Sequence, residues 1–183
     1  MTSALVSAAV LGLAVGLPYY ALPFFYDYFE QDTGWPRAAI LLGLPLGTLM
    51  TLAVGPLLTR RVPLKTGIVV GALVCGGSIA AMALCRGPVV YYWLCWIVYM
   101  TAWTFAGPLA HQVLLARAMP ERRAAAIATA FFGISAVGAV AVAFIARPLT
   151  AAYGYRTALA AVGVLMLAAA PIAALGLPAV ERE

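Results

Sequence analysis

The chain has 183 residues, of which 65% are hydrophobic and only 9% are charged. A soluble domain has about a quarter of its residues charged, so this chain has too few polar side chains to cover a surface in water. The composition excludes an ordinary soluble domain and predicts an all-α integral membrane protein that lies in the lipid bilayer. Helices are expected rather than a barrel, because the apolar runs are continuous and close to the roughly 20 residues that span a bilayer.

The net charge of +5 does not indicate nucleic-acid binding, because the Lys and Arg residues fall in the short segments between apolar runs. The cysteines at positions 75, 85 and 95 lack the spacing of metal ligands, and the single histidine is His111. We therefore expect no metal site, no cofactor and no disulfide. The expected contacts are lipid, a small-molecule substrate and a partner bundle, without nucleic acid.

Six apolar spans are predicted, which together make one bundle over residues 1–183: 4–26, 38–58, 66–85, 89–115, 124–146 and 157–177. Pro18 and Pro23 are expected to kink the first span, and an acidic loop at 27–37 follows it. Short loops make neighbouring helices antiparallel, so both termini lie on one side. The positive-inside rule places that side in the cytoplasm, since it carries seven basic residues against four. The expected location is the cell (inner) membrane, as a multi-pass protein.

Spans one to three and spans four to six form two triplets of opposite orientation. Pro108 lies late in the fourth span, as Pro18 and Pro23 do in the first. Inverted three-helix repeats of this kind build the six-helix halves of transporters.

Short motifs at the helix ends carry a resemblance. Gly34-Trp35-Pro36-Arg37-Ala38 resembles the Gly-Trp-Ser-Arg-Ala after the first helix in the monocarboxylate and oxalate/formate branch of the major facilitator superfamily. After the second span, Gly55 and Arg60 match that superfamily's Gly-x-x-x-Asp-Arg-x-Gly-Arg-Arg signature, although Thr59 stands where the acid belongs. Arg123-Ala124-Ala125-Ala126 resembles the Arg-Gly-x-Ala that opens helix five, and Gly154-Tyr155-Arg156 resembles the Gly-Trp-Arg before helix six.

The resemblance implies the N-terminal half of a twelve-helix transporter, with no enzymatic activity. Such a half moves a small solute by alternating access together with a second six-helix half or a homodimer partner, and the branch suggests an organic anion. Gly55, Arg60 and Arg123 would belong to the gating loops. The missing acid at Thr59 puts the family's charge-relay latch in doubt. The alternative interpretation is a non-transporting membrane partner or a degenerate transporter fragment.

In such a half, polar side chains near the membrane midplane line the substrate path. The candidates are Tyr19, Tyr20, Thr48, Thr51, Tyr99, Trp103 and Ser135. Tyr92, Trp96, Tyr99 and Trp103 follow i, i+4, i+7, i+11 spacing, so they share one helix face. That face is either an aromatic wall beside a solute path or ordinary packing combined with an interfacial aromatic belt.

Two further residues have two interpretations each. Arg147, at the outer end of the fifth span, either attracts an anionic substrate or snorkels to the interface. His111, near the cytoplasmic end of the fourth span, is either a proton relay or an interfacial residue.

An intramembrane serine protease is disfavoured. Such proteases of rhomboid type need a Gly-x-Ser-Gly nucleophile followed by a histidine base. Here Ser135 is followed by Ala136, and His111 precedes the serine.

Overall fold

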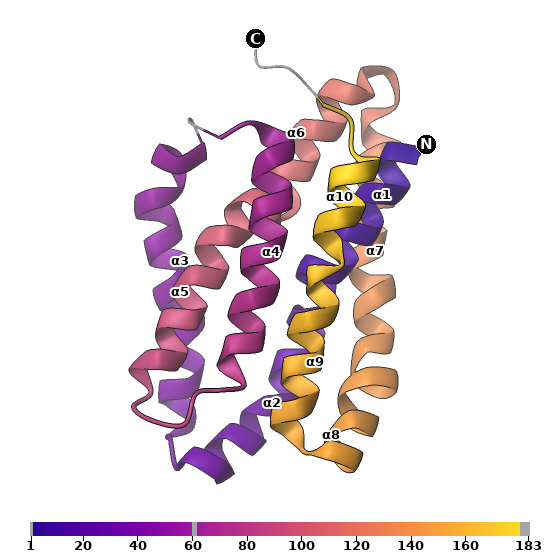
Figure 1. Cartoon of the computed structure of the whole chain (residues 1–183). Coiled ribbons are helices and arrows are strands. Elements are labelled where there is room, and N and C mark those ends of the chain that lie inside the picture. The colour runs from indigo at the N-terminus through magenta and orange to yellow at the C-terminus, as the bar shows by residue number, and fades with distance from the viewer. Residues whose placement is uncertain (1, 60–61, 180–183) are drawn as a thin grey trace.

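The computed structural model describes residues 2–59 and 62–179, and only the backbone of residues 54–59 (Figure 1). All regular elements in these ranges are helices, and no strand occurs among them. The predicted all-helical class is therefore confirmed.

The first helical segment is longer than the sequence suggested. It runs through α1 (Thr2–Leu11), the π-helix η1 (Gly12–Gly16) and α2 (Leu17–Thr33). Most of the expected loop at 27–37 is helix, so that prediction was wrong. The apolar run ends near Tyr26, but the helix continues until Gly34 adopts a left-handed conformation with φ of 70° and its N–H bonds to the Glu30 carbonyl at 3.1 Å. A change in polarity was mistaken for a helix end.

The next elements are α3 (Arg37–Thr59), α4 (Leu64–Met82), α5 (Val90–Ala106) and α6 (Pro108–Ala118). A single span at 89–115 was expected, and the structure instead has a break at Gly107, whose φ of −86° and ψ of −172° are extended. Pro108 then begins α6 at a position where the missing N–H costs nothing.

The remaining chain forms the short η2 (Pro120–Arg122), α7 (Arg123–Ala141), the π-helix η3 (Val142–Ala146) and α8 (Arg147–Tyr153). Gly154, with φ of 82°, reverses the chain into α9 (Tyr155–Leu167) and α10 (Ala169–Gly176). The Gly154-Tyr155-Arg156 motif therefore lies where α8 ends and α9 begins.

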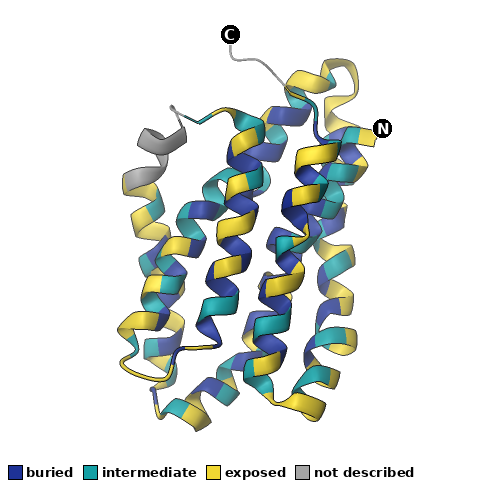
Figure 2. Ribbon diagram, in the orientation of Figure 1, coloured by how far each residue is buried: buried dark blue, intermediate teal, exposed yellow. Residues whose placement is uncertain are grey.

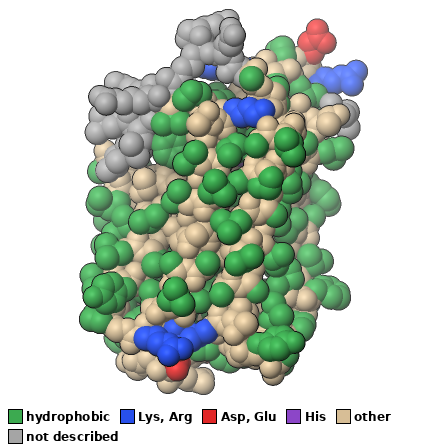
Figure 3. Space-filling model, viewed as in Figure 1, with side chains coloured by type: hydrophobic (Ala, Val, Ile, Leu, Met, Phe, Trp, Pro, Cys, Tyr) green, Lys and Arg blue, Asp and Glu red, His purple; other side chains and the backbone are tan. Residues whose placement is uncertain are grey.

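Four helices among the described residues are long and apolar enough to cross a membrane: Thr2–Thr33, Leu64–Met82, Pro120–Tyr153 and Tyr155–Gly176. Arg37–Ala53 is a shorter apolar helix, and α5 has 17 residues before the break at Gly107. On the face drawn in Figure 3, hydrophobic side chains run along the length of the bundle, and the charged side chains gather at its two ends. This distribution is compatible with a membrane location.

The helices pack side by side, with buried residues turned towards the middle of the bundle (Figure 2). The start of α1 and the end of α10 lie at the same end of the molecule (Figure 1). Small residues bring α1 and α7 close together, since a Cβ added to Gly133 would lie 2.0 Å from the Ala8 carbonyl oxygen.

Candidate functional site

A cavity of about 630 Å³ lies between the first helical segment, α3 and α5. Its lining is almost entirely apolar and aromatic: Val15, Pro18, Tyr19, Tyr20, Leu22, Pro23, Tyr26, Leu44, Trp96, Tyr99, Met100 and Trp103. Tyr19 and Tyr20 are 71% and 40% exposed, so the cavity opens to the outside of the bundle on their side. It contains four of the residues predicted for a substrate path.

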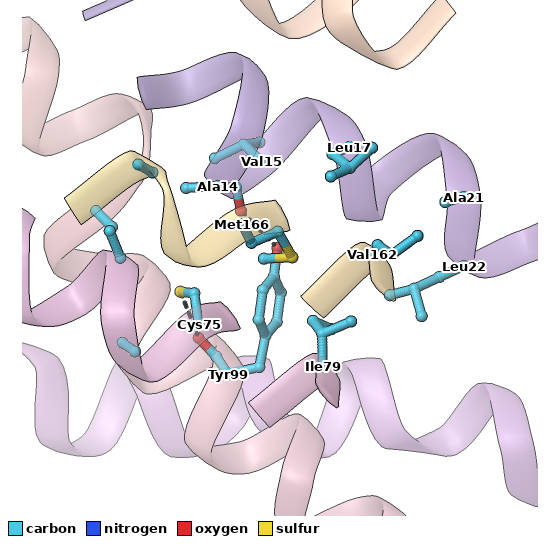
Figure 4. Packing of buried hydrophobic residues seen from close by; sticks show 14 of the residues in the cluster. Ala14, Val15, Leu17, Ala21, Leu22, Cys75, Ile79, Tyr99, Val162 and Met166 are labelled. Atoms are coloured by element: carbon cyan, nitrogen blue, oxygen red, sulfur yellow. Dashed lines mark hydrogen bonds between the residues drawn. The ribbon is translucent and has the colours of Figure 1, made fainter. Parts of the chain in front are cut away.

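The proline-rich part of α2 forms one wall of this cavity. Pro18 has no N–H to offer the Ala14 carbonyl four residues earlier, and the π-helix η1 ends just before it. The Tyr99 hydroxyl from α5 donates a hydrogen bond of 3.3 Å to that Ala14 carbonyl (Figure 4). This hydrogen bond connects the interrupted part of the first helix to α5, which forms the opposite wall. Tyr19 and Tyr20 directly follow the interruption.

The aromatic row on α5 forms the other wall, and the structure divides it into two parts. Tyr92 is fully buried and packs against Phe29 and Trp35, with ring centroids 5.2 and 5.7 Å away. It serves packing and does not line the cavity. Trp96, Tyr99 and Trp103 all line it. Trp96 and Tyr99 meet edge to face at 5.7 Å, which fixes both rings.

Charge is absent from the described lining of the cavity. The nearest cation in the ring network is Arg37, whose guanidinium carbon lies 5.5 Å from the centre of the Tyr26 ring. Arg37 is paired with Asp27 and lies 3.7 Å from Glu30, so it is already neutralised. The described wall offers ring faces, ring edges, apolar surface and the hydroxyls of its tyrosines, and no carboxylate, Lys, Arg or His is among its described residues. No cluster of three or more metal-ligating side chains occurs among the described residues.

Four of the predicted path residues therefore lie together, namely Tyr19, Tyr20, Tyr99 and Trp103. The other four, Thr48, Thr51, Ser135 and Arg147, do not line this cavity, and Thr51 is half-buried in α3. Thr48 is exposed and its hydroxyl donates to the Leu44 carbonyl of its own helix at 2.9 Å. Ser135 and Arg147 are exposed on α7 and at the start of α8.

None of the three predicted gating residues is among the described residues that line the cavity. Arg123 is exposed at the first position of α7. Arg60 lies outside the described residues, and only the backbone of Gly55, within α3, is described.

A polar cluster at one end of the bundle was not predicted. Asp32 accepts hydrogen bonds from the Tyr155 hydroxyl at 2.6 Å and from Arg156 Nε at 2.9 Å. Arg156 Nη1 also donates to the carbonyls of Ala83 and Cys85, at 2.7 and 2.9 Å. These bonds join the ends of α2 and α4 to the start of α9. The acidic stretch and the Gly-Tyr-Arg motif were both noted in the sequence, but nothing there indicated that they meet.

His111 is buried within the helical bundle. It lies in α6 with 0% exposure, and neither ring nitrogen has a hydrogen-bond partner among the described residues. The break at Gly107 allows α6 to turn this residue into the bundle.

Comparison with known proteins adds no family to this picture, since no protein-family description and no curated protein matches the chain. The class of protein therefore rests on the fold and the cavity. The chain is a bundle of apolar helices, compatible with a membrane location, with an aromatic cavity along one side.

Proposed function

We propose that the chain crosses the cell (inner) membrane six times, with both termini in the cytoplasm, as the N-terminal half of a transporter of the major facilitator type. The spans are α1–α2, α3, α4, α5–α6, α7–α8 and α9–α10. Support comes from the antiparallel order of these segments, from the four long apolar helices among them, and from the motifs at the helix ends. The orientation rests on the distribution of basic residues.

The proposal includes two inverted three-helix repeats. The first span and the fourth span are each interrupted next to a proline, at Pro18 and at Pro108. In inverted repeats these two spans correspond, and interrupted helices at corresponding positions are typical of transporter binding regions. Both interrupted spans carry residues that line the aromatic cavity.

The proposed function is transport of a small solute by alternating access. The observation that carries it is the cavity of about 630 Å³ that opens beside Tyr19 and Tyr20. A second six-helix half, or a second copy of this chain, would close the open side and rock against it. The mechanism involves binding and conformational change without covalent chemistry, so the chain is proposed not to be an enzyme.

An organic anion is the proposed solute class, on the strength of the Gly-Trp-Pro-Arg-Ala motif at 34–38. The cavity wall supplies no described cation, and Arg147 lies elsewhere. The group that neutralises the anion would therefore belong to the second half. A non-transporting partner or a degenerate fragment is the competing proposal, favoured by Thr59 in place of the acid of the gating motif.

Uptake of labelled monocarboxylates into proteoliposomes that contain only this chain tests whether it is self-sufficient. Saturable uptake above that of empty liposomes supports a transporting homodimer. Uptake equal to that of empty liposomes contradicts a self-sufficient transporter, and the requirement for a second half then stands to be tested in the cell.

A further inference from the structure

We infer that the transported solute carries a flat aromatic ring, and that the cavity between α2, α3 and α5 binds this ring. That the solute is transported rests on the proposed function. That its ring binds here rests on the cavity alone. Three observations carry it: the size of the cavity, the chemistry of its wall and the absence of charge from its described lining.

The size argues against a very small monocarboxylate as the natural occupant. A cavity of about 630 Å³ falls within the range of about 300–1,000 Å³ that is typical of sites for larger organic ligands. At about 30 Å³ per water-sized group, a solute of six heavy atoms such as pyruvate would occupy at most on the order of 180 Å³. Most of the aromatic wall would remain without a contact.

The wall has the chemistry of a ring-binding site. Six aromatic side chains line it: Tyr19, Tyr20, Tyr26, Trp96, Tyr99 and Trp103. Tyr19 and Tyr20 meet edge to face at 5.4 Å, and both are exposed at the opening, Tyr19 more than Tyr20, so ring surface is available to a ligand there. Trp96 and Tyr99, fixed at 88° to each other, present two differently oriented rings further in. A ligand ring can thus find offset-stacked and edge-to-face partners in one place.

The electrostatics determine which part of the solute this wall can hold. The described wall has no charged group to pair with a carboxylate, and the faces of its rings are negative. Arg37, the cation near Tyr26, is already paired with Asp27 and Glu30. This wall therefore suits the apolar ring of the solute, and the counter-charge for a carboxylate on the same solute must come from outside it.

Equilibrium binding of phenylpyruvate and pyruvate to the purified full chain, in nanodiscs of neutral phosphatidylcholine, tests the inference. We expect phenylpyruvate to bind at least about tenfold more tightly than pyruvate, the amount that ring contacts of this kind supply. Cyclohexylpyruvate, which has a similar apolar bulk without a π-system, should bind more weakly than phenylpyruvate. Equal binding of phenylpyruvate and pyruvate, or of the two ring compounds, would overturn the inference.

Matched variants locate the site. Tyr19→Ala removes a ring that is mostly exposed, so the fold should survive, and it should weaken phenylpyruvate binding severalfold without changing pyruvate binding. Trp103→Leu should do the same from the other wall. Tyr91→Ala, at a 55% exposed tyrosine on α5 that does not line the cavity, should leave binding unchanged. Loss of binding in Tyr91→Ala, or full binding in both cavity variants, would contradict the assignment.

The results that test ring binding differ from the results that test the proposed transport function. Preference for the ring in nanodiscs without any effect of the chain on cellular uptake would leave the cavity assigned and would reject transport. Cellular transport of pyruvate without a preference for the ring would do the reverse. Tighter binding of phenethylamine than of phenylpyruvate would retain the aromatic site and reject the anion.

Discussion

The Tyr99 hydroxyl on α5 donates a hydrogen bond of 3.3 Å to the Ala14 carbonyl in the first helix (Figure 4). The Ala14 carbonyl is available because Pro18 cannot supply the N–H that a regular helix would provide. The same tyrosine accepts a bond of 3.7 Å at its own carbonyl from the Cys75 thiol of α4. Tyr99 therefore joins three helices at the inner end of the aromatic cavity.

Replacing Tyr99 with Phe should lower the free energy of unfolding by about 1–2 kcal/mol, because a buried carbonyl loses its hydrogen-bond donor while the ring packing is kept. Denaturation of the purified protein in mild detergent, followed by circular dichroism, measures the change. No loss of stability would show that another group satisfies the carbonyl.

The control for this prediction is a double-mutant cycle with Pro18→Ala. Alanine at position 18 restores an N–H within reach of the Ala14 carbonyl, so the cost of Tyr99→Phe should shrink in that background. If Tyr99→Phe costs the same in the native chain and in the Pro18→Ala variant, the hydroxyl does not compensate for the proline.

The first helix also shows what the sequence could and could not predict. Its apolar run, its prolines and the depth of Tyr19 and Tyr20 were visible, because they depend only on residue type and position along the chain. The continuation of the helix to Thr33 was not, because the polar residues after Tyr26 looked like a loop while the true helix end depends on the backbone conformation of Gly34.

The site could be predicted only in part, because it depends on contacts between segments that are far apart in the sequence. Helical spacing correctly grouped Tyr92 with Trp96, Tyr99 and Trp103, but which of them packs and which lines a cavity depends on Phe29, Trp35 and α2. Likewise, Asp32 and Arg156 are 124 positions apart, so no local pattern could pair them.

Adding a methyl group to Gly133 should destabilise the bundle. Its Cβ would overlap the backbone of Ala8 in α1, so α1 and α7 would have to move apart, at a cost of about 1–3 kcal/mol. Gly77→Ala is the matched control, since a Cβ there meets nothing within 4 Å, and its stability should be unchanged or higher by up to about 1 kcal/mol. Thermal unfolding in detergent compares the two variants, and equal midpoints would contradict close packing at Gly133.

Removing the Asp32 charge should loosen one end of the bundle. Asp32→Asn weakens the bonds from Tyr155 and Arg156, and the Arg156 side chain, only 18% exposed, then keeps a charge without a counter-charge. We expect a loss of about 1 kcal/mol or more, and faster hydrogen exchange at the start of α9. Asp27→Asn is the control, because Asp27 and Arg37 are 69% and 41% exposed and their pair should contribute less. A larger loss in the control than in Asp32→Asn would refute this ranking.

Replacing His111 with Leu should leave the stability unchanged or raise it, because a buried polar ring without described partners gives way to an apolar side chain of similar volume. The unfolding midpoint of the variant measures this. A clear fall in the midpoint would show that the imidazole makes a stabilising contact. In a transport assay, retained stability with lost activity would favour the proton-relay interpretation.

The central claim is that this chain moves an organic solute across the membrane as part of a two-half transporter. Uptake of labelled phenylpyruvate and pyruvate, in the cell that naturally makes the chain with and without its gene, tests it most directly because any partner half is present. We predict that deletion lowers saturable uptake of the ring-bearing acid and that the restored native chain recovers it. Identical uptake in both cells across a panel of organic anions would contradict the account.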